Sequence, residues 1–124
     1  MSINKEMFKE IIGKKEGKVI FKFTASWCGP CKKAAPFIDE YINSLPENVK
    51  YYEIDVDKSL DVYGMLKTKR MVSGVPSLLC YYEDNTSVWP DEAISSSRGV
   101  DIKYFFETVL SKWWSWRKNA LYGY

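Results

Sequence analysis

Histidine is absent from this chain of 124 residues. Its absence excludes histidine-based acid–base catalysis, Ser-His and Cys-His nucleophilic pairs, and most mixed Cys/His zinc sites. A strong excess of one charge is missing too, because 18 basic residues are balanced by 16 acidic ones. Nucleic acids and anionic membranes attract strongly basic surfaces, so the charge balance predicts no nucleic-acid partner and no membrane-surface partner.

The sequence also has no long apolar run. No stretch approaches the ~18 apolar residues of a membrane-spanning helix. Residues 1–12 interleave lysine and glutamate with apolar side chains, which is unlike the core of a signal peptide. We therefore expect no membrane span and a cytoplasmic location. The length suits one domain of about 100–150 residues, which we place at residues 1–112, followed by an aromatic helical extension or tail at residues 113–124.

Hydrophobic periodicity predicts helices that alternate with strands. Strands are expected at 19–23, 49–56, 77–82 and 86–89, and helices at 3–12, 26–45, 59–66 and 101–113. Ser26 is expected to start the second helix, and Pro90 to end the last strand. This order predicts an α/β fold of three layers, α/β/α, in which helices flank a central mixed sheet of four to five strands.

Cysteine occurs only three times, at Cys28, Cys31 and Cys80. An odd number with one close pair does not suit the disulfide framework of a small secreted protein. At the start of a helix, unpaired backbone N–H groups and the helix dipole favour a Cys28 thiolate. Cys31, one turn further on, can close a disulfide or attack a mixed disulfide on Cys28, while Gly29 and Pro30 hold the tight turn. The spacing indicates that Cys28 is the nucleophile and Cys31 the resolving cysteine.

Other interpretations of the cysteines stay open. A CxxC pair is often half of a zinc site, but only Cys80 remains as a third thiolate and carboxylates would have to complete the site, so we expect no metal. The pair could instead be structural, on a domain that only binds other proteins. Cys80 lies in an apolar strand, where core packing is the expected role and redox regulation the alternative.

The segment Trp27-Cys28-Gly29-Pro30-Cys31 after a buried strand, Pro36 five residues beyond it, and Gly74-Val75-Pro76 before another strand resemble the thioredoxin family. The resemblance covers about residues 4 to 110 and implies the thioredoxin-like fold, with a cis peptide bond before Pro76 and the proline facing the cysteines. It also implies that Trp27 and the segment Gly74-Val75-Pro76 bind an extended substrate, which pairs with the backbone of Val75.

The resemblance implies a thiol-disulfide oxidoreductase. The Gly-Pro insert favours a reductant of protein disulfides, working through a reversible Cys28–Cys31 disulfide. No bound cofactor is expected, because electrons would come from an external thioredoxin reductase or an equivalent thiol. The alternatives are a disulfide oxidase or isomerase, and a non-catalytic interaction module.

Lys22 departs from the family, whose members commonly carry a buried aspartate six residues before the first cysteine. Glu53 on the next strand is the nearest candidate counter-charge. We predict that the two form an ion pair that retains proton handling or stabilises a thiolate. The alternative is a lysine with a buried stem whose ammonium group reaches solvent and has no catalytic role.

The last residues are unusually aromatic for this family. Helical spacing predicts that Trp113 and Trp116 continue the apolar stripe of the closing helix onto the core. Trp114, Tyr122 and Tyr124 would then remain for contact with a partner or with a second copy of the chain.

Overall fold

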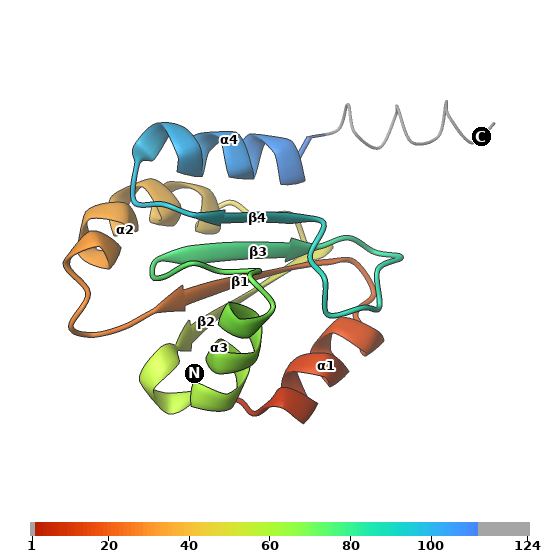
Figure 1. Cartoon of the computed structure of the whole chain (residues 1–124). Coiled ribbons are helices and arrows are strands. Elements are labelled where there is room, and N and C mark those ends of the chain that lie inside the picture. The colour runs from red at the N-terminus through yellow and green to blue at the C-terminus, as the bar shows by residue number, and fades with distance from the viewer. Residues whose placement is uncertain (1, 112–124) are drawn as a thin grey trace.

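A four-stranded sheet separates two pairs of helices in the computed structural model, which describes residues 2–111 (Figure 1). The helices α1 and α3 cover one face of the sheet, and α2 and α4 cover the other. The elements in chain order are α1 (Lys5–Lys14), β1 (Lys18–Thr24), α2 (Gly29–Ile42), β2 (Val49–Asp55), the 3-10 turn η1 (Val56–Lys58), α3 (Leu60–Thr68), β3 (Ser77–Tyr81), β4 (Glu92–Ser95) and α4 (Gly99–Val109).

The strand order across the sheet is β2-β1-β3-β4. β1 and β2 run parallel, because α2 carries the chain back across the sheet between them, whereas β3 pairs antiparallel with both β1 and β4. The predicted α/β/α sandwich with a mixed sheet is confirmed. Its described part holds four strands, the lower end of the expected range.

The central strand β1 is buried on both faces of the sheet. Its side chains alternate, so Phe21 and Phe23 point into the core beneath α1 and α3, while Ile20 points into the core beneath α2 and α4. Lys22 shares the face of Ile20 by this alternation. A charged side chain therefore sits in the layer between the sheet and α2.

Aromatic rings fill much of both cores. In the α1/α3 core, the ring of Phe8 lies 4.7 Å from that of Phe21 and 6.0 Å from that of Tyr81. In the α2/α4 core, Tyr41 stacks on Phe106 with ring centroids 4.7 Å apart. Burying a side chain of this size contributes about 1.5–3 kcal/mol to stability, so both helical layers are held firmly to the sheet.

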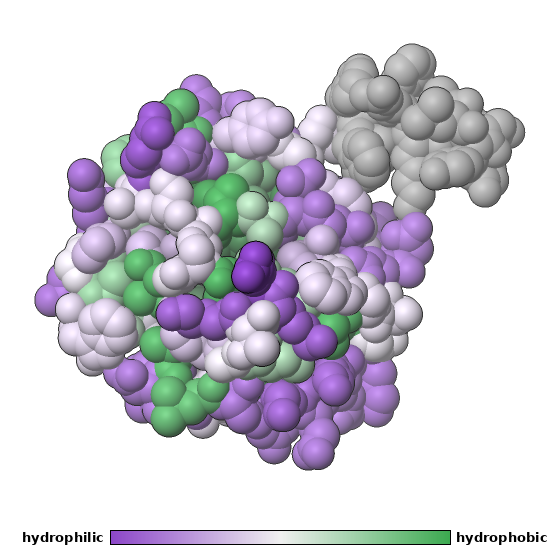
Figure 2. All heavy atoms as spheres, in the orientation of Figure 1, coloured by the Kyte–Doolittle hydropathy of each residue, from purple (hydrophilic) through white to green (hydrophobic). Residues whose placement is uncertain are grey.

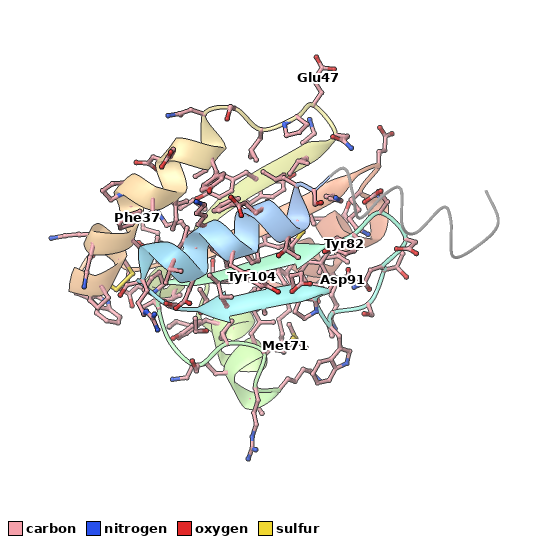
Figure 3. The ribbon with its side chains drawn as sticks, turned by 90° about the horizontal axis from the view of Figure 1, so that it is seen from above. Phe37, Glu47, Met71, Tyr82, Asp91 and Tyr104 are labelled. Atoms are coloured by element: carbon pink, nitrogen blue, oxygen red, sulfur yellow. A yellow bond between two sulfur atoms is a disulfide. The ribbon has the colours of Figure 1, made fainter. Side chains whose placement is uncertain are left out.

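The last strand was predicted wrongly at residues 86–89, and the structure places β4 at Glu92–Ser95. Side chains of the connecting loop explain the difference. The carboxylate of Asp91 accepts hydrogen bonds from the backbone N–H of Tyr82, at 2.7 Å, and from the amide of Asn85, at 3.0 Å (Figure 3). Ser87 donates its backbone N–H to Asn85 Oδ1 at 2.9 Å. These local bonds compete with strand pairing, so the chain stays irregular until Glu92.

The outer surface mixes polar and apolar side chains on the face seen in Figure 2. Among residues 2–111, no helix combines the length and the apolar character needed to cross a membrane. The predicted extension at 113–124, with Trp113, Trp114 and Trp116, lies outside the described residues, as do the boundary at residue 112 and the contacts expected of Tyr122 and Tyr124.

Candidate active site

The cysteine pair lies where β1 ends and α2 begins. Sequence analysis expected Ser26 to start this helix, but Cys28 is the N-cap and α2 begins at Gly29. The Cys28 sulfur accepts a hydrogen bond from the backbone N–H of Cys31 at 3.1 Å. Pro30 fits the first turn, because its missing N–H would have no partner there. A sulfur atom thus takes the place of the usual N-cap oxygen.

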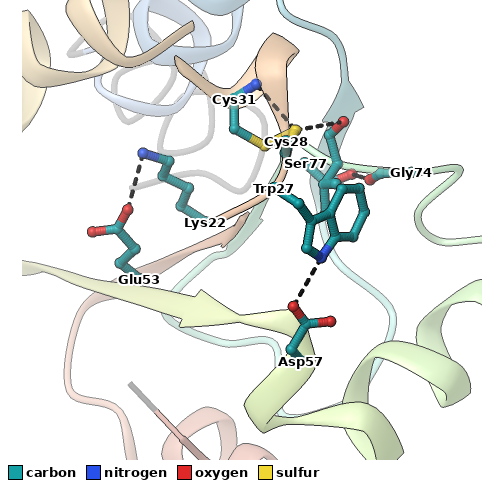
Figure 4. Close-up of a disulfide and its surroundings, with 9 residues drawn as sticks. Lys22, Trp27, Cys28, Cys31, Glu53, Asp57, Gly74 and Ser77 are labelled. Atoms are coloured by element: carbon teal, nitrogen blue, oxygen red, sulfur yellow. Dashed lines mark hydrogen bonds and ion pairs between the residues drawn. A yellow bond between two sulfur atoms is a disulfide. The ribbon is translucent and has the colours of Figure 1, made fainter. Parts of the chain in front are cut away.

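Cys28 and Cys31 form a disulfide, with their Cα atoms 5.3 Å apart (Figure 4). The two residues are only 3% and 4% exposed. One helical turn brings the two side chains to the same end of α2, so the bond forms between neighbours and needs no rearrangement of the fold. The pair can therefore interconvert between dithiol and disulfide while the surrounding fold stays the same.

Trp27 stands in front of the pair with 66% of its surface exposed. Its indole N–H donates to Asp57 Oδ2 at 2.8 Å, which links the loop before α2 to η1 (Figure 4). The backbone N–H of Asp57 in turn donates to Asp55 Oδ1 at 2.9 Å. The sequence did not reveal this role of Asp57, because its contact with Trp27 depends on a long-range approach that local spacing does not show.

The loop before β3 faces the disulfide from the other side. The Val75–Pro76 peptide bond is cis, as predicted. The Val75 carbonyl oxygen lies 3.7 Å from Cys28 Sγ. The structure therefore brings Val75 next to Cys28, although the two are separated by 47 residues.

Two serine hydroxyl groups hold this loop in place, and sequence analysis missed both. Ser77 Oγ donates to the Gly74 carbonyl at 2.5 Å (Figure 4). It also lies 2.6 Å from Ser95 Oγ. Ser95 Oγ also accepts the backbone N–H of Ser73 at 3.1 Å. β4 thereby supports the loop that contacts the disulfide. The signal available in the sequence was a polar residue, Ser77, directly after Pro76 and before an apolar strand.

A groove of about 350 Å³ opens beside the disulfide, between the cis-proline loop and the connection from β4 to α4. Its lining comprises Pro30, the segment Ser73-Gly74-Val75-Pro76, and the segment Ser95-Ser96-Ser97-Arg98. Three segments distant in sequence therefore form one surface next to the sulfur atoms.

Cys80 is separate from this site. It is fully buried and packs in the α2/α4 core, whereas Cys28 and Cys31 pack with the α1/α3 core. Burial raises the pKa of the Cys80 thiol to about 12. Within the described part of the chain, no three His, Cys, Asp or Glu side chains come together as a potential metal site.

Comparisons with known proteins agree with this geometry. The sequence model of the thioredoxin family matches residues 1–101. Thioredoxin from Bacillus subtilis is 39% identical over 97 residues, which are 78% of this chain and 83% of that protein. Thioredoxin from Pseudomonas aeruginosa is 28% identical over 98 residues, 79% of this chain and 87% of the relative.

Solved structures show the same fold. Trichomonas vaginalis thioredoxin superposes with a TM-score of 0.70 at 22% identity, covering 88% of this chain and 94% of that one. Plasmodium falciparum thioredoxin gives a TM-score of 0.64 at 26% identity, covering 85% and 93%. The chain belongs to the thioredoxin family. With its Cys28–Cys31 disulfide at the CxxC position, this thioredoxin-family protein is a thiol-disulfide oxidoreductase.

The predicted ion pair between Lys22 and Glu53 is present in this family member. β1 and β2 place the two residues directly opposite each other, and Lys22 Nζ lies 3.1 Å from Glu53 Oε1 (Figure 4). The Lys22 side chain is 6% exposed and that of Glu53 is 53% exposed. The ammonium group therefore meets a carboxylate at the edge of the core and does not reach solvent, while a role of this pair in proton handling or thiolate stabilisation stays a prediction.

Proposed function

We propose that the protein reduces disulfide bonds in other proteins, with Cys28 as the attacking cysteine and Cys31 as the resolving one. The position of the Cys28 sulfur carries this proposal. It caps α2, receives the Cys31 N–H at 3.1 Å and lies beside the Val75 carbonyl. In the dithiol form, the same N–H and the positive end of the helix would stabilise a Cys28 thiolate, which is the species that attacks a disulfide.

The reaction transfers two electrons to the substrate in two exchange steps. The Cys28 thiolate attacks one sulfur of the substrate disulfide, so a mixed disulfide forms and the first substrate sulfur leaves as a thiolate that takes up a proton. Cys31 then loses its proton and attacks Cys28 Sγ. The second substrate thiol is released, and the Cys28–Cys31 disulfide remains.

The substrate would bind as an extended segment across the groove beside the pair. Gly74, Val75 and Pro76 line that groove, and the exposed ring of Trp27, next to Cys28 in the chain, would add an apolar contact outside the lining. Backbone pairing gives affinity with little dependence on sequence. This suits an enzyme that acts on several disulfide-containing proteins.

Electrons would come from outside the protein. Each cycle leaves Cys28–Cys31 oxidised, so a thioredoxin reductase or an equivalent thiol reductant must restore the dithiol. The chemistry uses only the two cysteines, and we propose that it needs no bound cofactor. A reducing compartment such as the cytoplasm is where such a cycle can run.

Lys22 and Glu53 would tune this chemistry from beneath the pair. The Lys22 ammonium group, paired with Glu53 at 3.1 Å, would stabilise the Cys31 thiolate as it forms. The same effect favours the reduced protein and so raises its reduction potential. A large increase of the reduction potential by Lys22 would favour the second candidate function, that of a disulfide oxidase or isomerase.

Trapping the mixed disulfide tests the proposed roles. Cys31→Ser should stop the reaction after the first step and accumulate a covalent complex with a disulfide-containing protein such as insulin, released by dithiothreitol. Cys28→Ser is the matched control and should trap little or none. If neither variant traps a partner and the wild type reduces no disulfide, the non-catalytic interaction module becomes the better account. If Cys28→Ser traps the partner instead, the two roles are exchanged.

A further inference from the structure

The groove beside the disulfide carries one charged side chain in its lining, that of Arg98. The rest of the lining is made of four serines, Pro30 and the segment Gly74-Val75-Pro76, and it includes no acidic residue. A substrate segment that crosses this groove therefore passes one cation and no carboxylate among the lining residues, and the carboxylate that contacts Arg98, that of Asp101, lies just outside the lining. A single positive charge in the groove distinguishes substrate segments by their charge, which backbone pairing alone does not do.

Two of the serine hydroxyl groups are already engaged within the protein. Ser95 Oγ is bound to Ser77 and to the backbone N–H of Ser73. Ser96 Oγ donates to Asp101 Oδ2 at 2.7 Å and accepts the backbone N–H of Arg98 at 3.1 Å. These two groups shape the groove and have little hydrogen-bonding capacity left for a substrate. Arg98 is the strongest polar feature that remains.

The Arg98 side chain is 73% exposed, and its closest ionic contact is weak. Arg98 Nε lies 3.7 Å from Asp101 Oδ2, beyond hydrogen-bond distance, and that oxygen already accepts from Ser96. Arg98 is also the N-cap residue of α4, so the positive end of the helix dipole adds to its charge. The guanidinium group can therefore turn toward a bound peptide without breaking a strong bond.

We propose that Arg98 is a specificity-determining residue, which favours substrates with an acidic side chain close to the reactive cysteine. The inference rests on the proposed function, since it concerns the substrates of that reaction. A guanidinium group can bind a carboxylate through two parallel hydrogen bonds, and it repels a lysine placed at the same position. Because the pair would be solvent-exposed, its effect on the rate should be modest and should depend on salt.

Synthetic peptides with one internal disulfide provide the test. The peptides differ only in carrying Glu, Gln or Lys next to one of the two cysteines, on either flank. For the wild type at low salt, we expect kcat/KM to be about two- to fivefold higher for a Glu peptide than for the matching Lys peptide on one flank. Arg98→Gln should reduce that ratio toward one, Arg98→Glu should invert it, and high salt should weaken it.

Lys103→Gln is the matched control. It removes the same charge from an exposed position of the same helix, where Lys103 lies 3.9 Å from Glu107, and it is outside the groove lining. This variant should keep the wild-type ratio, and none of the variants should change the reduction potential. An unchanged ratio in Arg98→Glu, or no preference in the wild type on either flank, overturns the inference. A wild type that reduces none of the peptides instead overturns the proposed function.

Discussion

At the scale of single residues, the unusual feature of this protein is a buried lysine, Lys22, on β1, the strand that leads to its redox pair. Burying an ammonium group without a partner is costly, and Glu53 at 3.1 Å offsets that cost for Lys22. Glu53 is itself half-exposed, so the pair sits between the core and solvent. A cation held in this place should act on any negative charge that forms at the cysteines.

Replacing Lys22 with methionine should therefore lower the reduction potential. Without the cation, the thiolates of the reduced form lose stabilisation, and we expect a decrease of about 15–30 mV, equivalent to about 0.7–1.4 kcal/mol. Equilibration with dithiothreitol buffers, followed by tryptophan fluorescence, measures this decrease. Lys103→Met, which removes a charge from the surface, should leave the potential unchanged. A Lys22→Met potential equal to that of the wild type would show that Lys22 has no redox role.

Removing the Glu53 carboxylate should lower the free energy of unfolding of the protein. Glu53→Gln leaves the buried Lys22 ammonium group without its carboxylate, and because Glu53 is half-exposed we expect a loss of about 1–2 kcal/mol, less than for a fully buried pair. Urea unfolding measures the difference. Glu10→Gln, which breaks an exposed pair with Lys14, is the control and should change stability by less than about 0.5 kcal/mol. Equal effects at the two sites would contradict this account of the pair.

Cys80 should be inert in the folded protein. Burial raises the pKa of its thiol to about 12, so the thiolate is scarce at pH 8 and reagents cannot reach it. Labelling of the reduced native protein with iodoacetamide at about pH 8 should modify Cys28, whose thiolate the N-terminus of α2 favours, but not Cys80. Unfolding in urea should expose the third thiol. Rapid labelling of Cys80 in the native state would revive the idea of redox regulation.

At the scale of elements, a second buried lysine, Lys18, links β1 to the end of α4 through a hydrogen bond. Lys18 Nζ, at the start of β1, donates to the carbonyl of Val109 at the last residue of α4, at 2.6 Å. It also lies 5.2 Å from the ring centroid of Tyr82. A cation at the end of a helix interacts favourably with the dipole and can donate to one of the last carbonyl groups of the helix.

Lys18→Met should destabilise the protein by about 1–2 kcal/mol, because the Val109 carbonyl loses a charged donor. Denaturant unfolding provides the measurement. Lys14→Met removes an exposed lysine at the end of α1 and should cost less than about 0.5 kcal/mol. The reduction potential should be unchanged in both variants, since Lys18 is outside the cysteine site. A Lys18→Met protein as stable as the wild type would show that the hydrogen bond from Lys18 to Val109 does not stabilise the fold.

The elements could be predicted from sequence wherever the apolar pattern was clear, as in the nearly continuous apolar run of β1 and the helical spacing of apolar residues in α4. The pairing of Lys22 with Glu53 could also be predicted, because parallel neighbours place residues of the same face side by side. The position of β4 could not, since Asp91 and Asn85 hold the preceding loop through side-chain bonds that hydropathy does not reveal. The N-cap was missed because Ser26 is a common cap and a cysteine is not.

At the scale of the whole molecule, the site exists only because the sheet brings three segments together. The end of β1, the loop before β3 and the connection after β4 meet around the disulfide, and hydrogen bonds from Ser77 and Ser95 fix the middle one. The CxxC motif and the cis-proline are local signals that a sequence reveals. The roles of Ser95, Arg98 and Asp57 depend on long-range packing, so only the three-dimensional structure could reveal them.

The reduction potential of the wild-type Cys28–Cys31 pair tests the central claim most directly. The value is obtained by equilibrating the purified protein with dithiothreitol and glutathione buffers. A reductant of protein disulfides should lie near the potential of thioredoxin, about −270 mV, with at most a modest upward shift from Lys22. A value near about −180 mV, the potential of protein disulfide isomerase, would contradict the reductant assignment and favour an oxidase or isomerase.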